Sequence, residues 1–160
     1  MFVLDFKTVE RPYHHVASAL TTGLAEILEL ALAAARTESD RFRVGLAPFG
    51  WPTSLAQRVN VQPGPVRAQR EGILIAFTWH AVAGASLFPR MDADLEVAPI
   101  GRDRTILNLR GRLTIASELI GGGTEEFLIL RLAESMNRAF LVGVCASLES
   151  EARAIPDPVS

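Results

Sequence analysis

The sequence predicts an α+β fold in which a curved antiparallel sheet of about seven strands wraps around one long C-terminal helix. Residues 124–153 carry the longest helical pattern, and segments with strand patterns follow one another between residues 41 and 114 with no helix between them. At ~1.5 Å per residue the last helix spans roughly 40 Å. That is about the width of a compact domain of 160 residues, so a sheet laid against the helix would bury its apolar stripe economically.

The C-terminal helix has sequence signals at both ends. Three glycines at 121–123 interrupt the chain, Thr124 offers an N-cap hydroxyl, and two glutamates follow in the first turn, where the helix dipole favours negative charge. Prolines at 156 and 158 predict the stop, so we expect a single domain over residues 1–154 and a frayed tail over 155–160. The residues that recur at helical spacing are Leu128, Leu132, Ser135, Met136, Ala139, Val142, Gly143 and Ala146.

The start of the chain predicts one strand and two short helices. Phe2–Val9 alternates between an apolar side and a side with Asp5 and Lys7, which is typical of a half-buried strand. Pro12 is tolerated at the first turn of a helix, and apolar residues then recur with a period of 3.6. Weak helix formers at 21–23 predict two helices, or one kinked helix, over residues 13–36.

A series of strands follows. The segments with strand patterns are residues 41–46, 55–62, 66–71, 72–83, 90–98 and 105–114, with a Pro-Gly-Pro turn at 63–65. Both faces of 72–83 are largely apolar, which predicts a covered, central strand. The last two segments form a hairpin around 99–104. Its outward acids, Asp92, Asp94 and Glu96, would face outward arginines across the strands.

Composition restricts the function classes. The net charge is −2 and hydrophobic residues make up 49%, which gives no support to nucleic-acid binding. Cys145 is the single cysteine, so we expect no internal disulfide and no thiolate metal site. The longest apolar run, 25–35, contains two glutamates and is too short to span a bilayer, and no signal sequence is visible. We therefore expect a cytoplasmic monomer or homodimer, not inserted in a membrane, without a metal or cofactor.

Several segments carry a resemblance to a known family. They are Trp79-His80-Ala81, Leu87-Phe88-Pro89, residues 94–99, residues 104–111, Arg131-Leu132-Ala133 and Phe140-Leu141. In this order of elements they resemble the START-like or Bet v 1-like helix-grip superfamily, also called SRPBCC, and look closest to small bacterial polyketide cyclase-like members. The resemblance covers residues 2–149.

The resemblance implies a deep apolar cavity between the sheet and the C-terminal helix. In this superfamily the cavity holds lipids, sterols, polyketides or other hydrophobic molecules; some members are cyclases or hydrolases, and many only bind. Related members often carry a Pro-Pro-Gly turn before the last helix. Residues 115–123 lack that turn, so we expect the cavity entrance to differ. Small residues on the last helix (133, 139, 143 and 146) either leave such a cavity open or permit close helix-to-sheet packing.

Candidate site residues follow from these patterns. His80 could act as a general acid or base, or it could lie on the outer face of its strand. The residues that could line a pocket for a flat apolar ligand, or simply form core, are Phe77, Trp79, Phe88, Leu107, Leu109, Leu132 and Met136. Phe49 and Trp51 could cover the entrance. His14 and His15 are neighbours on a helix, and we expect them to be solvated and not to bind metal.

Three functional hypotheses remain open. The leading one is binding of a hydrophobic small molecule, lipid or polyketide-like, without catalysis. The second is a polyketide cyclase-type enzyme with His80 and Arg110 as polar groups in the cavity. The third is a structural or interaction module whose core is filled. Paired glycosidase-type carboxylates are disfavoured, because the three acids of the hairpin share the face opposite the predicted core.

Overall fold

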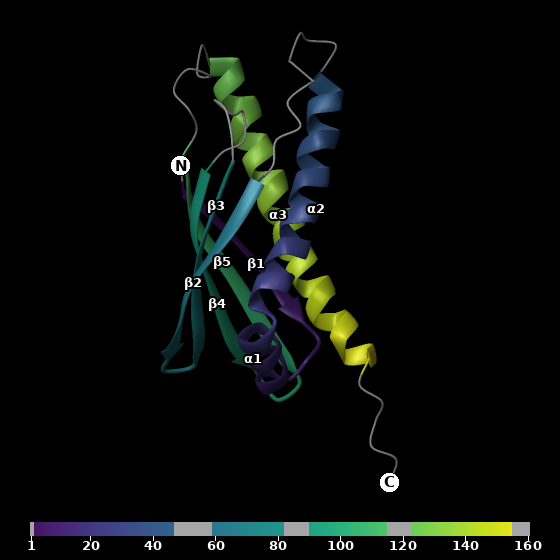
Figure 1. The fold of residues 1–160 in the computed structure, drawn as a ribbon. Coiled ribbons are helices and arrows are strands. Elements are labelled where there is room, and N and C mark those ends of the chain that lie inside the picture. Colours follow the sequence, from purple (N-terminus) through teal and green to yellow (C-terminus); the bar gives the residue numbers. More distant parts are fainter. Residues whose placement is uncertain (1, 47–58, 82–89, 115–122, 155–160) are drawn as a thin grey trace.

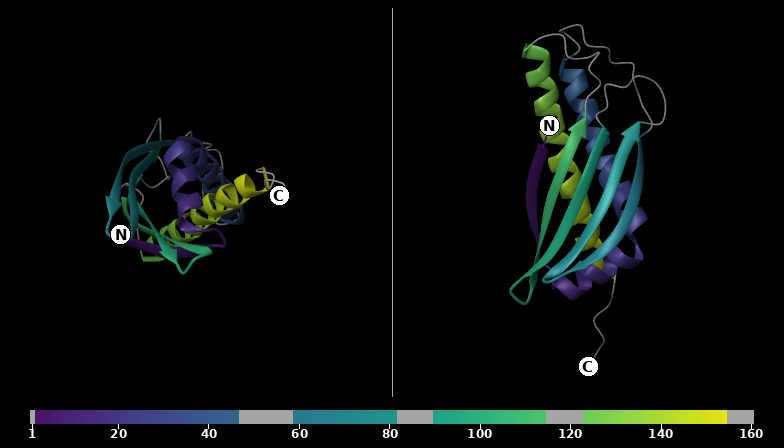
Figure 2. Two further views of the ribbon diagram at one scale, coloured as in Figure 1. Left: turned by 90° about the horizontal axis from the view of Figure 1, so that it is seen from below. Right: turned by 90° about the vertical axis from the view of Figure 1, so that its left-hand side faces the viewer.

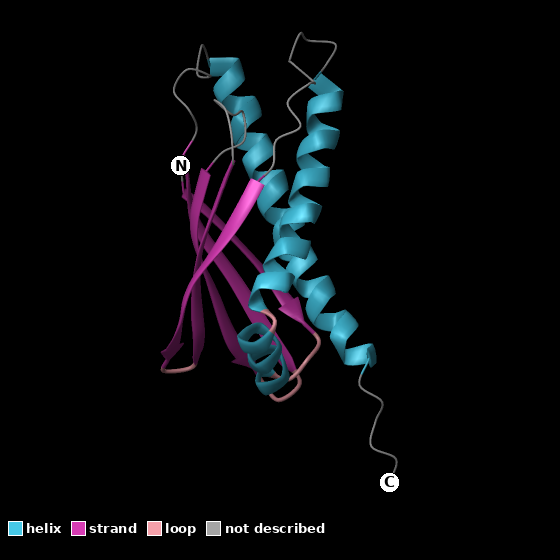
Figure 3. Cartoon of the chain, in the orientation of Figure 1, coloured by secondary structure: helices cyan, strands magenta, loops and turns pink. Residues whose placement is uncertain are grey.

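The computed structural model describes residues 2–46, 59–81, 90–114 and 123–154, and it has two layers: an antiparallel sheet and a group of helices on its concave side (Figures 1 and 3). The elements in chain order are β1 (Phe2–Val9), α1 (Tyr13–Thr22), α2 (Leu24–Leu46), β2 (Val59–Gln69), β3 (Gly72–Ala81), β4 (Arg90–Ile100), β5 (Arg104–Thr114) and α3 (Gly123–Ala154). The predicted fold class, a curved antiparallel sheet against a long C-terminal helix, is confirmed.

The sheet has five described strands in the order β1-β5-β4-β3-β2, fewer than the seven expected. Two wrong strand predictions account for the difference between five and seven strands. Residues 41–46 are the last turns of α2, and the segments 55–62 and 66–71 contribute to the single strand β2. The predicted turn at 63–65 is instead a bulge, where the register against β3 shifts between Pro63 and Val66. An edge strand tolerates proline there because a bulge leaves ladder hydrogen bonds unmade.

The wrong strand prediction at 41–46 has a physical reason. Alternation over six residues is compatible with a short strand, but Phe42 also continues a helical series with Ala35 and Ser39 at spacings of four and three. Ala35 and Ser39 are buried and Phe42 is half-buried. The continuation of α2 along α3 therefore fits the helical period of 3.6 residues and not the strand period of two. A window of six residues is too short to distinguish them.

The hairpin of β4 and β5 forms as predicted. Inward and outward residues alternate strictly along both strands, and Gly101 adopts a positive φ of 65° in the turn. Asp92 pairs with Arg112 in the register, and Asp94 with Arg110. Arg110 also forms an ion pair with Glu96 at 3.3 Å. The charged face of the hairpin is therefore the solvent-facing, convex face of the sheet, and its apolar face lies toward the helices.

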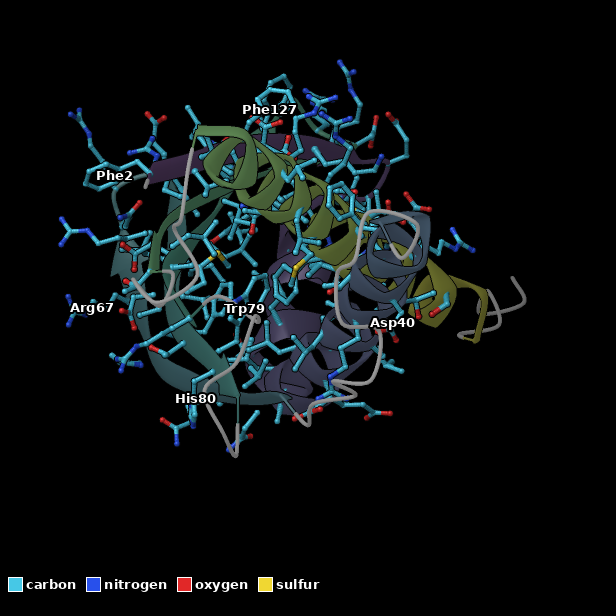
Figure 4. The ribbon with its side chains drawn as sticks, turned by 90° about the horizontal axis from the view of Figure 1, so that it is seen from above. Phe2, Asp40, Arg67, Trp79, His80 and Phe127 are labelled. Atoms are coloured by element: carbon cyan, nitrogen blue, oxygen red, sulfur yellow. The ribbon has the colours of Figure 1, made fainter. Side chains whose placement is uncertain are left out.

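The first strand lies at the edge beside β5, and its apolar side faces outward. Phe2, Leu4 and Phe6 are each more than two-thirds exposed, and Figure 4 shows Phe2 outside the curve of the sheet. The guanidinium of Arg112 lies 5.0 Å above the ring of Phe2. The inner side of β1 faces α3, where the buried Val9 contributes to the core.

Two helices follow β1, as predicted, but the second is not short: α2 continues beyond the predicted end at residue 36 to Leu46. The break between the helices is at Gly23, whose N–H donates to the Ala19 carbonyl at 2.9 Å. The chain bends there by 93°. This bend lets α1 lie across one end of the sheet against β4 and β5, while α2 runs along α3 (Figure 2). In the part of the chain that the structure describes, no single helix is long and apolar enough to cross a membrane; α1 and α2 pass that test only as a bent pair.

The long helix α3 packs against both the sheet and α2. Its buried residues are Leu132, Ala133, Met136, Asn137, Phe140, Leu141, Val144, Cys145 and Leu148. Two residues of the predicted stripe, Val142 and Ala146, are exposed instead. Gly143 lies against Ala31 of α2, so this small residue serves the contact between the helices and not the helix-to-sheet packing that the sequence suggested. At the other end, the buried Arg11 donates a hydrogen bond to the Leu148 carbonyl and anchors α3 to the β1–α1 junction.

Candidate functional site

Six of the predicted pocket residues face one another across the interior between the sheet and α3. Phe77 and Trp79 come from β3, Leu107 and Leu109 from β5, and Leu132 and Met136 from α3; none is more than 3% exposed. The strands bring their residues together because alternate side chains point to the concave face, and α3 brings its pair together at a spacing of four. Phe88, Phe49 and Trp51 lie outside the described residues.

An aromatic cluster forms the centre of this interior. The ring of Phe140 stacks on Phe77 with centroids 5.1 Å apart and meets the Trp79 ring edge-on, also at 5.1 Å. Such arrangements stabilise by ~0.5–1.5 kcal/mol beyond their buried area. Sequence reasoning did not assign Phe140 to the site. Its spacing of four residues from Met136 could have identified it.

Asn137 is the unexpected residue of this interior. Its side chain is 0% exposed, yet the apolar stripe predicted for this helix does not include it. Neither its Oδ1 nor its Nδ2 has a hydrogen-bond partner among the residues that the structure describes. A buried carboxamide can accept two hydrogen bonds and donate two, and leaving it unpaired costs ~1–3 kcal/mol. Asn137 precedes Phe140 by three residues, so both lie on the same side of α3.

His80 lies outside the interior. Trp79 points into the curve of the sheet, and the next residue, His80, points away from it, as Figure 4 shows. Arg110, the second polar group assigned to the cavity, is also on the convex face, where it pairs with Glu96 and its side chain is 67% exposed. Neither side chain can reach a molecule held between the sheet and α3. The cyclase hypothesis thus loses both of its named polar groups.

The convex face carries its own polar network. The Thr78 hydroxyl donates to Asp92 Oδ1 at 2.9 Å, and Arg90 approaches the same oxygen at 3.3 Å. Partial desolvation raises the pKa of Asp92, but the hydrogen bonds from Thr78 and Arg90 and the charges of Arg90 and Arg112 outweigh it and hold the pKa below its ordinary value. The three acids are outward, as predicted, and lie on an open strand surface that is paired with arginines.

A hollow lies between α2 and α3. It measures about 610 Å³, and its walls include Phe42, Val142, Arg41, Arg131 and Arg138. The Ser135 hydroxyl donates to Glu38 across it at 2.6 Å, and Glu38 and Glu134 hold Arg41 and Arg131 at 3.9 and 3.3 Å. Its lining is therefore a mixture of charged, polar and apolar side chains, unlike the apolar interior on the other side of α3.

Comparison with solved structures finds the same arrangement elsewhere. The chain is similar to the protein TTHA0849 from Thermus thermophilus, with a TM-score of 0.51 and 12% identity over 95% of this chain and 99% of that one. The chain has a helix-grip fold, in which a curved antiparallel sheet packs against a long C-terminal helix. Further likenesses are the Zhui aromatase/cyclase from Streptomyces sp. R1128, with a TM-score of 0.47 and 13% identity over 96% of both chains, and Ara h 8.0201, with 0.36 and 7% over 94% and 98%. No protein-family model and no curated protein matches the chain.

The helix-grip fold brings few metal-ligating groups together here. Within the four described segments, no group of three or more His, Cys, Asp or Glu could hold a metal ion. His14 and His15 are exposed at the start of α1, as expected, with ring centroids 4.1 Å apart.

Proposed function

We propose that this helix-grip domain binds a hydrophobic small molecule, lipid or polyketide-like, between the concave face of the sheet and α3. One observation carries the proposal: two facing surfaces, one from β3 and β5 and one from α3, are apolar and include aromatic and methionine side chains. Pockets for small apolar ligands are built in this way, with few polar groups among many hydrophobic ones.

The proposed site lies toward the end of the fold where α2 and α3 rise past the ends of the strands (Figure 1). Trp79 is two residues from the end of β3 at this side, and the first turns of α3 carry the half-buried Leu128 and Leu130. The rings of Trp79 and Phe140 are fully buried against each other and would form the base of the site. Met136, four residues before Phe140, has a flexible thioether side chain that can adapt to a ligand.

Binding is favoured over catalysis because of where the polar groups lie. His80 and Arg110, which the cyclase alternative requires in the cavity, are on the opposite face of the sheet. Of the buried polar groups, Arg11 and Thr105 are hydrogen-bonded to main-chain carbonyls, Arg11 to that of Leu148 and Thr105 to that of Arg11. They hold the structure together and are not available to a substrate.

The test uses Trp79 as a reporter. In a Trp51→Phe variant Trp79 is the single tryptophan, because the chain has only two. Titration with cis-parinaric acid, a fluorescent lipid, should quench Trp79 emission by energy transfer. Leu132→Phe adds bulk to the inner face of α3 and should weaken binding about tenfold, which corresponds to ~1.4 kcal/mol.

Val142→Phe is the matched control. It adds a phenyl ring on the outer face of the same helix, in the hollow beside α2, and should leave affinity unchanged. If Val142→Phe weakens binding and Leu132→Phe does not, the ligand binds in that hollow and not between the sheet and α3. If energy transfer is absent with the lipid and with a flat probe such as anthraquinone, the proposal is wrong and the filled-core module is favoured.

A further inference from the structure

The side chain of Asn137 is an unused pair of hydrogen-bonding groups inside an apolar interior. It is fully buried, and its oxygen and nitrogen both lack a partner within the described structure. Buried polar groups in folded proteins are nearly always paired, so each exception calls for an explanation. Replacement by an apolar residue of similar shape would remove the penalty, and a carboxamide here therefore needs a reason beyond packing.

The surroundings of Asn137 on its own helix are mainly apolar. Of the four residues at spacings of three and four, Ala133, Phe140 and Leu141 are buried, while Glu134 is exposed and pairs with Arg131. Phe140 continues into the aromatic cluster with Phe77 and Trp79. At ~1.5 Å per residue, Asn137 lies roughly 4.5 Å from Phe140 along the helix axis. It lies on the side of Phe140 that is nearer to the end of the fold where α2 and α3 extend past the strands. The amide is thus next to the base of the proposed site.

We propose that Asn137 is the polar anchor of the ligand, an assignment that rests on the proposed binding function. Its Nδ2 donates to an acceptor of the ligand and its Oδ1 accepts from a donor. A carboxamide presents these two groups side by side, so it fits a flat, largely apolar molecule that carries a donor directly beside an acceptor, as in a ring lactam. Specificity arises because a ligand without this pair leaves the buried amide unsatisfied.

Three matched probes test the assignment. 2-Quinolinone carries an N–H beside a carbonyl, N-methyl-2-quinolinone lacks the donor, and cis-parinaric acid reports on apolar binding as a whole. The wild-type chain should bind 2-quinolinone at least tenfold more tightly than its N-methyl analogue. This preference should disappear in both Asn137→Leu and Asn137→Ala, while cis-parinaric acid still binds. The ratio of the two affinities is the readout, because it does not depend on how stable each variant is.

Leu141→Met is the control, since it changes the shape of a neighbouring buried residue without a polar group, and it should keep the preference. The assignment is overturned if the wild-type chain binds both quinolinones equally or neither while it binds cis-parinaric acid, or if the preference survives in Asn137→Ala. In those cases the binding function stands and the amide is satisfied by an internal water molecule. Failure of all three probes to bind would instead overturn the binding function itself.

Discussion

Burial makes Cys145 an inert side chain. The thiol is 2% exposed on the buried face of α3. Desolvation raises its pKa from 9.0 to about 11, the charge of Lys7 opposes this shift in part, and Glu149 adds to it. Because the thiolate is the reactive form, the folded protein should react slowly with thiol reagents at neutral pH.

The raised pKa also predicts how stability depends on pH. Between pH 9 and 11 the thiol ionises in the unfolded chain but not in the folded one, so the unfolded state releases a proton and stability falls as the pH rises. The loss in the free energy of unfolding should reach at most about 3 kcal/mol. Urea unfolding of the wild-type chain and Cys145→Ala at several pH values measures it. The difference between the two proteins should shrink across this window; a constant difference would contradict the assigned pKa.

At the scale of elements, the crossing of α2 and α3 depends on a glycine. A Cβ at Gly143 would lie 2.8 Å from the Cα of Ala31 and 3.2 Å from the Cβ of Ala34. The closest atom belongs to the main chain, so it cannot move aside alone, and the helices would have to separate. The apolar period of α3 shows only that one side of the helix is buried. That side packs partly against α2 and partly against the sheet.

Gly143→Ala should therefore destabilise the protein. Alanine gains ~1 kcal/mol of helix propensity over glycine, but overpacking of a close contact costs ~1–3 kcal/mol, and we expect a net loss of about 1 kcal/mol in urea unfolding. Ala34→Gly removes the methyl group that would lie 3.2 Å from the added Cβ, while the main chain of Ala31 stays in place. In the double variant the two changes should couple favourably. A Gly143→Ala protein more stable than the wild-type chain would show that the helices do not approach this closely.

At the scale of the whole molecule, the two faces of the sheet have separate roles. The concave face and α3 enclose the aromatic cluster and Asn137, while the convex face holds the charged network and His80. Neighbouring residues on one strand thus belong to different environments, and the curvature of the sheet keeps them apart.

Leu109 and Arg110 of β5 test this division. Leu109→Ala removes a fully buried side chain and should destabilise the protein by ~2–5 kcal/mol. Arg110→Ala removes an exposed ion pair with Glu96 and should cost less than ~1 kcal/mol. Urea unfolding of both variants gives the comparison. Equal losses would mean that the convex face is covered in solution, for example by a second copy of the chain.

The sequence by itself determined the elements with strong, long patterns. The C-terminal helix was predicted within one residue at each end, because glycines lie at its start, prolines follow its end and its apolar period extends over about five turns. The buried face and the turn of the last hairpin were predicted correctly, since strict alternation of charged and apolar residues defines which face is buried. The two helices before it followed from the weak helix formers at their break.

Tertiary structure alone decided which face of an element is buried and which other elements it packs against. The sequence could not place His80, because both faces of β3 are largely apolar and only the packing of α3 selects the inner one. The apolar stripe predicted for the last helix did not include Asn137, since a single buried amide leaves no periodic signal. It read 41–46 as a strand, because a short apolar alternation fits both periods and the contact with α3 selects the helix. Long local patterns therefore determine what a segment is, whereas long-range packing determines what it contacts and decides the short, ambiguous segments.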